Sequence, residues 1–293
     1  MRWRSRLPPL ERGAGTFDGS MDRDIQSRKA PSEIVATMCG DTTICMPARP
    51  FPPAYPHGSL RELFPGIYFV TGSAVMPGPI PMRFSRNMTV VKQGDALTLI
   101  GSLRLDDAGL AALDALGKVE HVVRLAGFHG MDDPFYKDRY GAKVWVVKGH
   151  VYAAGFDAPK TPRGQGYFEP DVEMDATTEL PIEGASLISF ECTAGEALLR
   201  LDRDGGILVA GDSLQNWGTV DRYFNLPASL VMRLMGFIKP HNVGPGWLRG
   251  AKPEIARVKA ILDLDFEHVL PVHGEAVLGG AKEKYRPAIL GLS

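Results

Sequence analysis

Ile207-Leu-Val-Ala-Gly-Asp212 and His268-Val-Leu-Pro-Val-His-Gly274 are the two stretches that decide the fold. Each is a short apolar run, typical of a buried strand, that ends in a polar side chain and a glycine. Loops that follow strands are where α/β folds collect functional groups, and Asp and His are common ligands of Zn²⁺ and iron. Asp212 and His273 are therefore the first candidates for a site.

Two further motifs follow expected strands and carry side chains of the same chemistry. Gly127-Phe-His-Gly-Met-Asp-Asp133 follows a strand expected at 121–125 and contributes His129, Asp132 and Asp133. Cys192-Thr-Ala-Gly195 follows a strand expected at 186–190 and contributes a thiol. Imidazole, carboxylate and thiolate groups are the usual protein ligands of Zn²⁺.

In order and spacing, these four motifs resemble the metallo-β-lactamase fold across roughly residues 60–285. That fold has a His-rich loop after an early strand, a His-Thr-Pro-Gly-like turn, a Gly-Asp strand end and a late His-Gly. The resemblance implies an α/β protein, an αββα sandwich of two mixed β-sheets flanked by helices. It also implies that Asp212 and His273 converge at one rim of the sheets and belong to a metal site.

The chain departs from the resembled pattern at the loop that reads His-x-His-x-Asp-His. In one register His129 takes the first position and Asp133 the Asp position, while Met131 and Pro134 replace the other histidines. In the other register Asp132 and Asp133 fill the last two positions, and residues without donors replace the first two. Cys192 stands where the third motif has its histidine. The resemblance thus gives one set of candidate ligands: His129, Asp133, Cys192, Asp212 and His273.

Each candidate also has a structural interpretation. Asp133 precedes a proline and suits a helix N-cap, and Cys192 suits a small buried position. His129 and His273 are also compatible with ordinary hydrogen bonding at strand ends, and Asp212 with a turn. The candidate ligands suffice for one metal ion and are too few for two.

Three functions remain open from the sequence. The first is a mononuclear hydrolase of a small-molecule ester, lactone, thioester or similar bond, in which one Zn or Fe ion is held by Asp212, His273 and His129, the catalytic residues. The second is a metal-free pseudoenzyme or ligand-binding module of the same fold, with its pocket under an insertion at 151–180. The third is a metal-independent enzyme with His129 or His273 as general base beside an Asp.

Composition narrows the classes of partner. The 293 residues carry a formal net charge of −1 and no long run of Lys or Arg, so neither nucleic acid nor a membrane is expected as a partner. A small-molecule substrate or ligand is expected, and the oligomeric state stays open. Cys39, Cys45 and Cys192 cannot all pair within the chain, and no apolar run resembles a signal peptide or membrane span. A cytoplasmic location is therefore expected.

The chain divides into two regions by pattern. Residues 1–57 are proline-rich without apolar periodicity and predict a disordered or non-native extension, with Met38 or Met46 as possible starts. The folded domain is expected at residues 58–293. Within it, Asp106 predicts a helix N-cap, and Gly94-Asp95 predicts a hairpin turn. Strands are expected at 66–71, 87–91, 96–100, 121–125, 144–148, 186–190, 197–201, 207–210 and 269–272, and helices after 106, after 133, at 226–238 and around 255–262.

The first prediction concerns the extension. A truncated protein that begins at Met46 should keep the melting temperature of the full chain, because the removed residues have no apolar periodicity with which to pack. Differential scanning calorimetry of the two proteins measures this. A clear drop in melting temperature would show that the removed residues pack on the domain.

Overall fold

A computed structural model describes residue 51 and residues 53–76, 78–150 and 169–293. Residues 50–293 form one compact unit, and the fold reported below is that of this unit. The interpretation of residues 1–50 and of most of the 151–180 insertion lies outside the described residues.

The first sheet is mixed and contains seven strands that lie in the order of the chain. Its first four strands pair antiparallel and its last four pair parallel, with helices α1 (Asp107–Asp114) and α2 (Asp133–Tyr140) in the crossovers. The strands are β1 (Arg61–Phe64), β2 (Ile67–Met76), β3 (Met82–Gln93), β4 (Ala96–Ile100), β5 (Lys118–Arg124), β6 (Lys143–Val147) and β7 (Val172–Met174).

The second sheet has four strands in the order β13-β10-β9-β8, and only the β10–β13 pair is parallel. A two-stranded ribbon, β11 with β12, follows the end of β10. These strands are β8 (Ala185–Phe190), β9 (Glu196–Leu201), β10 (Ile207–Ala210), β11 (Leu214–Gln215), β12 (Asn242–Val243) and β13 (His268–Pro271). The helices of this half are α3 (Leu226–Leu234), α4 (Pro245–Ala251), α5 (Ile255–Lys259) with a 3₁₀ turn at Ala260–Asp263, and α6 (Ala281–Leu290).

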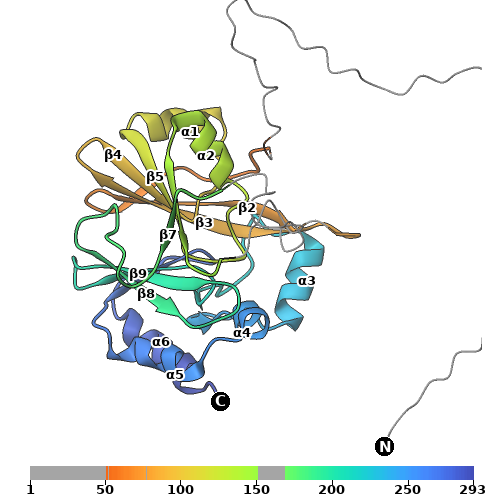
Figure 1. The fold of residues 1–293 in the computed structure, drawn as a ribbon. Helices are drawn as coiled ribbons and strands as arrows, with labels where there is room; N and C mark the ends of the chain where they lie inside the picture. The colour runs from red at the N-terminus through yellow and green to blue at the C-terminus, as the bar shows by residue number, and fades with distance from the viewer. Residues whose placement is uncertain (1–50, 52, 77, 151–168) are drawn as a thin grey trace, which may run out of the picture. The chain divides into compact units, whose positions relative to one another are not determined.

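The two sheets pack face to face and helices cover the outer face of each (Figure 1). Strand β10 shows the cause, since successive side chains of a strand point to opposite faces. Ile207 and Val209 lie in the apolar layer between the sheets, whereas Leu208 and Ala210 pack towards α4, α5 and α6. The αββα sandwich of two mixed sheets expected from the sequence is confirmed.

Several local expectations hold at the level of single residues. Strands β4 and β10 have the predicted bounds, and Gly94-Asp95 forms the two-residue turn between β3 and β4. Asp106 caps α1 by accepting from the backbone N–H of Gly109 at 2.8 Å. None of the helices among the described residues is long and apolar enough to cross a bilayer.

Other expectations need correction. Asp133 is the first residue of α2 rather than its N-cap, and Asp132 precedes the helix without a side-chain cap bond, because both carboxylates bind elsewhere. Helix α3 ends at Leu234 rather than 238, since Gly236 takes a positive φ of 79° and turns the chain. Strand β7 lies inside the insertion expected at 151–180, and α4 and α6 were not predicted.

The folded unit begins before residue 58, the boundary that the sequence suggested. The imidazole of His57 accepts from the N–H of Asp106 at 2.9 Å, and Gly58 N–H donates to Thr71 at 2.8 Å. The ring of Phe51 packs edge-on against that of Phe135, with centroids 5.6 Å apart. Pro-rich composition hid these contacts because they depend on single side chains and not on a periodic pattern.

The second prediction tests the layer between the sheets. Leu199→Ala should lower the free energy of unfolding by about 2–5 kcal/mol, because Leu199 is fully buried between the sheets and its loss leaves a cavity. Leu290→Ala on α6 is the matched control, 55% exposed, and should change it by less than about 0.5 kcal/mol. Urea unfolding measures both, and equal losses would contradict the sheet-on-sheet packing.

Candidate functional site

The parallel pairing of β10 and β13 brings two of the candidate residues to the same edge of the second sheet. Ala210 pairs with Pro271 at the ends of these strands, and Asp212 and His273 each follow two residues later. His129 comes from the loop after β5 in the first sheet, and Ala126 in that loop bridges to Glu196 of β9. The site therefore spans both sheets, and the expectation that Asp212 and His273 lie close together is confirmed.

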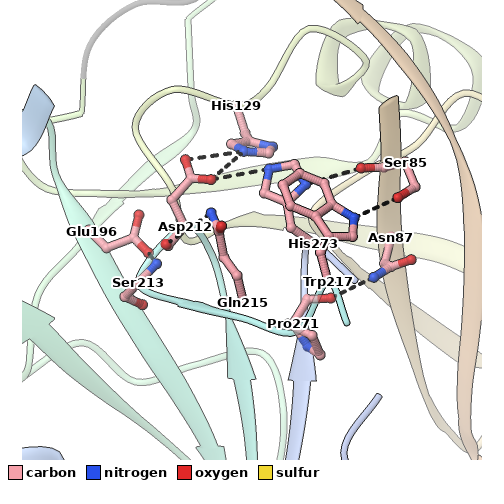
Figure 2. A network of polar contacts seen from close by, with 10 residues as sticks. All are labelled: Ser85, Asn87, His129, Glu196, Asp212, Ser213, Gln215, Trp217, Pro271 and His273. Carbon is pink, nitrogen blue, oxygen red and sulfur yellow. Dashed lines mark hydrogen bonds and ion pairs between the residues drawn. The ribbon is translucent and has the colours of Figure 1, made fainter. Parts of the chain in front are cut away.

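The three side chains form one compact cluster, shown in Figure 2. Nε2 of His129 lies 3.2 Å from both carboxylate oxygens of Asp212, and Nε2 of His273 lies 3.2 Å from Oδ1. One ligand atom of each residue falls within 4.8 Å of the other two. Among the described residues, no other group of three His, Cys, Asp or Glu side chains gathers in this way.

Burial and charge set the protonation of the cluster. Burial raises the pKa of Asp212, but the contacts with His129 and His273 outweigh it and hold the pKa well below its ordinary value. Burial lowers the pKa of His273, against the opposing effect of Asp212. At neutral pH Asp212 is therefore ionised and His273 is neutral.

The neutral tautomer of His273 follows from its other ring nitrogen. Nδ1 lies 3.1 Å from the carbonyl oxygen of Ser85, which only accepts, so Nδ1 carries the proton. Nε2 then presents a bare lone pair to the ionised carboxylate of Asp212, 3.2 Å away. Two acceptors facing each other at this distance are stable only with a cation or a proton between them.

The imidazole of His273 is held from behind by aromatic packing. The ring of Trp217 lies against it with centroids 4.5 Å apart, and Trp217 Nε1 donates to Ser85 Oγ at 2.7 Å. Trp217 is 2% exposed, so it closes the inner side of the site to water. Orientation of a ligand histidine by a fixed partner on its second nitrogen is typical of metal sites.

The backbone that carries His273 is also fixed. Asn216 N–H donates to the carbonyl of His273 at 2.9 Å, and Glu275 N–H donates back to Asn216 at 3.0 Å. Gly274 between them has a φ of 88°, and a Cβ there would lie 2.1 Å from the Asn216 backbone, so only glycine fits. Asn87 on β3 donates to Pro271 at 2.8 Å and ties this loop to the first sheet.

Glu196 is a buried residue of the site that the sequence analysis missed. Its Oε1 accepts from the N–H of Ser213 at 2.8 Å, directly behind Asp212 (Figure 2), and its carboxylate fills the space that a Cβ at Gly211 would need. Burial and the negative charge of Asp212 raise the pKa of Glu196 well above its ordinary value. The only signal in the sequence was a charged residue at the start of an apolar strand.

The structure does not bring Asp133 or Cys192 into the cluster. Asp133 accepts from Ser102 Oγ at 2.5 Å and pairs with Arg124 at 3.3 Å. Asp132 pairs with Arg86 and accepts from the N–H of Arg104. The loop's carboxylates thus neutralise buried arginines, a role that the ligand pattern concealed.

Cys192 is half-buried and packs at the edge of the apolar layer beneath α4, α5 and α6. Burial raises the pKa of its thiol, so the thiolate that a metal needs is disfavoured there. His241, another loop histidine, stacks edge-on against Tyr285, 5.6 Å between centroids, and is likewise outside the cluster.

The fold of this protein is similar to that of known structures. The protein aligns with a metallo-β-lactamase from Hirschia baltica at 16% identity and a TM-score of 0.50, over 80% of this chain and 98% of that one. It aligns with the DIM-1 metallo-β-lactamase at 13% identity and a TM-score of 0.52, over 81% of this chain and 100% of the other. The chain has the metallo-β-lactamase fold.

VMB-1 is a further similar structure, at 14% identity and a TM-score of 0.54 over 81% of this chain and 98% of the other. No family model and no curated protein matches the sequence. At such identities the metallo-β-lactamase fold is shared, whereas activity has to be argued from the site itself.

The donors of the cluster suit one metal ion. They offer two imidazoles, of which that of His273 is neutral, and one ionised carboxylate, and metal ligands must be deprotonated to bind. Two histidines and a carboxylate are a known ligand set for mononuclear Zn²⁺ and Fe²⁺ that leaves positions open.

The third prediction concerns Glu196. Because its pKa is raised in the folded protein, the folded state keeps a proton that the unfolded chain releases above the ordinary value of 4.5. The stability contributed by the neutral carboxyl is thus fully present below pH 4.5 and is lost as the pH rises towards the folded-state pKa.

Glu196→Gln removes this titration and retains the size of the side chain. Wild type should therefore lose stability relative to Glu196→Gln as the pH rises above 4.5, and the difference should stop changing below it. Urea unfolding at a series of pH values from acidic to neutral measures the difference in free energy of unfolding between the two proteins. Groups that titrate equally in both proteins do not contribute to this difference. A difference that is constant over the whole range would mean that the pKa of Glu196 is not raised.

Proposed function

We propose that the protein is a mononuclear metal-dependent hydrolase of a small-molecule ester, lactone, thioester or similar bond. The observation that carries the proposal is the contact between the bare Nε2 of His273 and the ionised carboxylate of Asp212, 3.2 Å apart. These two lone-pair atoms face each other, and a third ligand atom on His129 lies beside them. The three are arranged to share a cation.

His129, Asp212 and His273 would hold the ion, which is Zn²⁺ or Fe²⁺ by ligand type. When bound, the ion supplies a Lewis acid for the substrate's carbonyl and lowers the pKa of a water molecule towards neutrality. Three protein ligands leave room for both.

The chain's own residues orient the donors and exclude water from behind. Ser85 fixes the ring of His273, and Trp217 covers its inner side. Next to His129, a small cavity of about 20 Å³ has space for about one water molecule and is too small for a substrate. A substrate would therefore have to reach the cluster by another route.

A second candidate is a metal-independent enzyme in which a histidine acts as general base. The observation in its favour is the His129–Asp212 pair, in which Nε2 lies 3.2 Å from both carboxylate oxygens. An imidazole oriented by a carboxylate can accept a proton from water or a hydroxyl group. Turnover that survives complete removal of metal would favour this candidate, and absence of both metal and turnover would favour a ligand-binding module.

The fourth prediction is that the purified, tag-free protein holds at most one equivalent of Zn or Fe. The described residues gather only three ligands, which is too few for two ions. Asp212→Asn should lower the affinity for that ion by a factor of about 100 or more, since it removes the only charged ligand. Elemental analysis and competition with a chromogenic chelator measure both quantities.

Cys192→Ser is the matched control, because Cys192 lies near the end of the same sheet but outside the cluster. It should leave the metal content unchanged, and the wild type should be a poor β-lactamase in a nitrocefin assay. Two tightly held equivalents that survive dialysis against a mild chelator would contradict the proposal. So would retention of the metal by Asp212→Asn.

A further inference from the structure

The outer face of helix α3 is made of large aliphatic side chains that none of the described residues covers. Leu226, Leu230 and Leu234 recur every four residues and are 83%, 59% and 79% exposed. The opposite face, with Ala228 and Met232, is buried against Phe84 and Trp217. A helix that buries one face and exposes leucines on the other lacks the polar face of an ordinary surface helix.

The tip of the β2–β3 hairpin extends this apolar surface. The N-cap residue of α3, Asn225, accepts from Arg83 N–H at 3.2 Å and donates from its side chain to Pro81 at 2.9 Å. Ile80 at the tip is 66% exposed, and Figure 1 shows α3 beside this end of the hairpin. We call the set Ile80, Leu226, Leu230, Leu234 and Met235 the leucine face.

The two segments of the chain that carry the leucine face contain basic residues and no acidic ones. Residues 222–253 include no Asp or Glu, and residues 63–94 include none either, although the chain as a whole has a net charge of −1. Arg233 on α3, Lys239 just after it and Arg249 on α4 are all exposed. Arg249 is placed at the face itself, since its guanidinium donates to the carbonyl of Met235 at 3.1 Å.

We propose that the leucine face docks onto the surface of an anionic lipid bilayer. Protruding aliphatic side chains enter the acyl boundary, while neighbouring Arg and Lys side chains meet negatively charged headgroups. A second copy of the chain would bring cations against cations, which disfavours it as the occupant. The helix is too short to span a bilayer, so the contact is peripheral.

The sequence predicted no membrane partner because it shows no long run of Lys or Arg. The fold supplies what the sequence pattern lacked, since cations separated along the chain are gathered beside one helix. The docked face is also close to the candidate site. Phe84 and Trp217, which α3 packs against, are the side chains that touch the ring of His273.

The test is co-sedimentation of the full chain with vesicles. One set is pure phosphatidylcholine, and the other is phosphatidylcholine mixed with phosphatidylserine at roughly two to one. Wild type should bind the anionic vesicles and lose binding as salt rises. Leu230→Gln with Leu234→Gln should lower the partition coefficient by a factor of about 10 or more.

The matched control replaces two leucines of similar exposure elsewhere, Leu278→Gln with Leu290→Gln, which are 48% and 55% exposed. This double variant should bind as wild type does. Failure of the wild type to bind anionic vesicles would overturn the proposal. Equal losses of vesicle binding in the two double variants would overturn it as well. A dimer in sedimentation equilibrium that only the Leu230 and Leu234 replacements dissociate, without vesicle binding, would assign the face to a second copy instead.

Discussion

The parallel pairing of β10 with β13 is the constraint on which the site depends. Because Ala210 lies opposite Pro271, the residues two positions beyond each of these neighbouring strands lie side by side at the same edge of the sheet. A one-residue slip in this register would turn the strands' apolar side chains to the wrong layers, so core packing on both faces fixes the register. The positions of Asp212 and His273 are thus determined by residues that have no chemical role.

The first sheet contributes to the site through buried charge. Arg86 and Arg124 lie in the interior of this half of the unit. Asp132, just before α2, and Asp133, its first residue, neutralise them. Breaking one partner of such a pair leaves an uncompensated buried charge, which costs several kcal/mol. The loop that carries His129 is therefore held in place by ion pairs, and Arg124 adds a hydrogen bond to the carbonyl of His129 at 2.9 Å.

The sequence predicted what depends on local pattern and missed what depends on partners distant in the chain. Strand β10, the hairpin at Gly94-Asp95 and the Asp106 cap are local, and each follows from a few neighbouring residues. Asp133 looked like a ligand because its arginine partner is not recognisable from spacing. Glu196 was overlooked because its position beside Asp212 arises only when β9 pairs with β10, which the spacing of the sequence does not reveal. Of the candidate ligands, the structure brings together His129, Asp212 and His273.

The origin of the cluster in two sheets has a thermodynamic consequence. His129 follows a strand of the first sheet, and Asp212 and His273 follow strands of the second, so the three ligand atoms meet only when the sheets have docked. A cation held by all three would act as a cross-link across the sandwich. It would bind the native state and scarcely the unfolded chain, and at a hundredfold excess over its dissociation constant it would add about 2.7 kcal/mol to native stability. Affinity for the ion and cohesion of the two sheets are in this way coupled, because a substitution deep between the sheets that populates the unfolded chain would weaken the apparent affinity for the ion without touching a ligand.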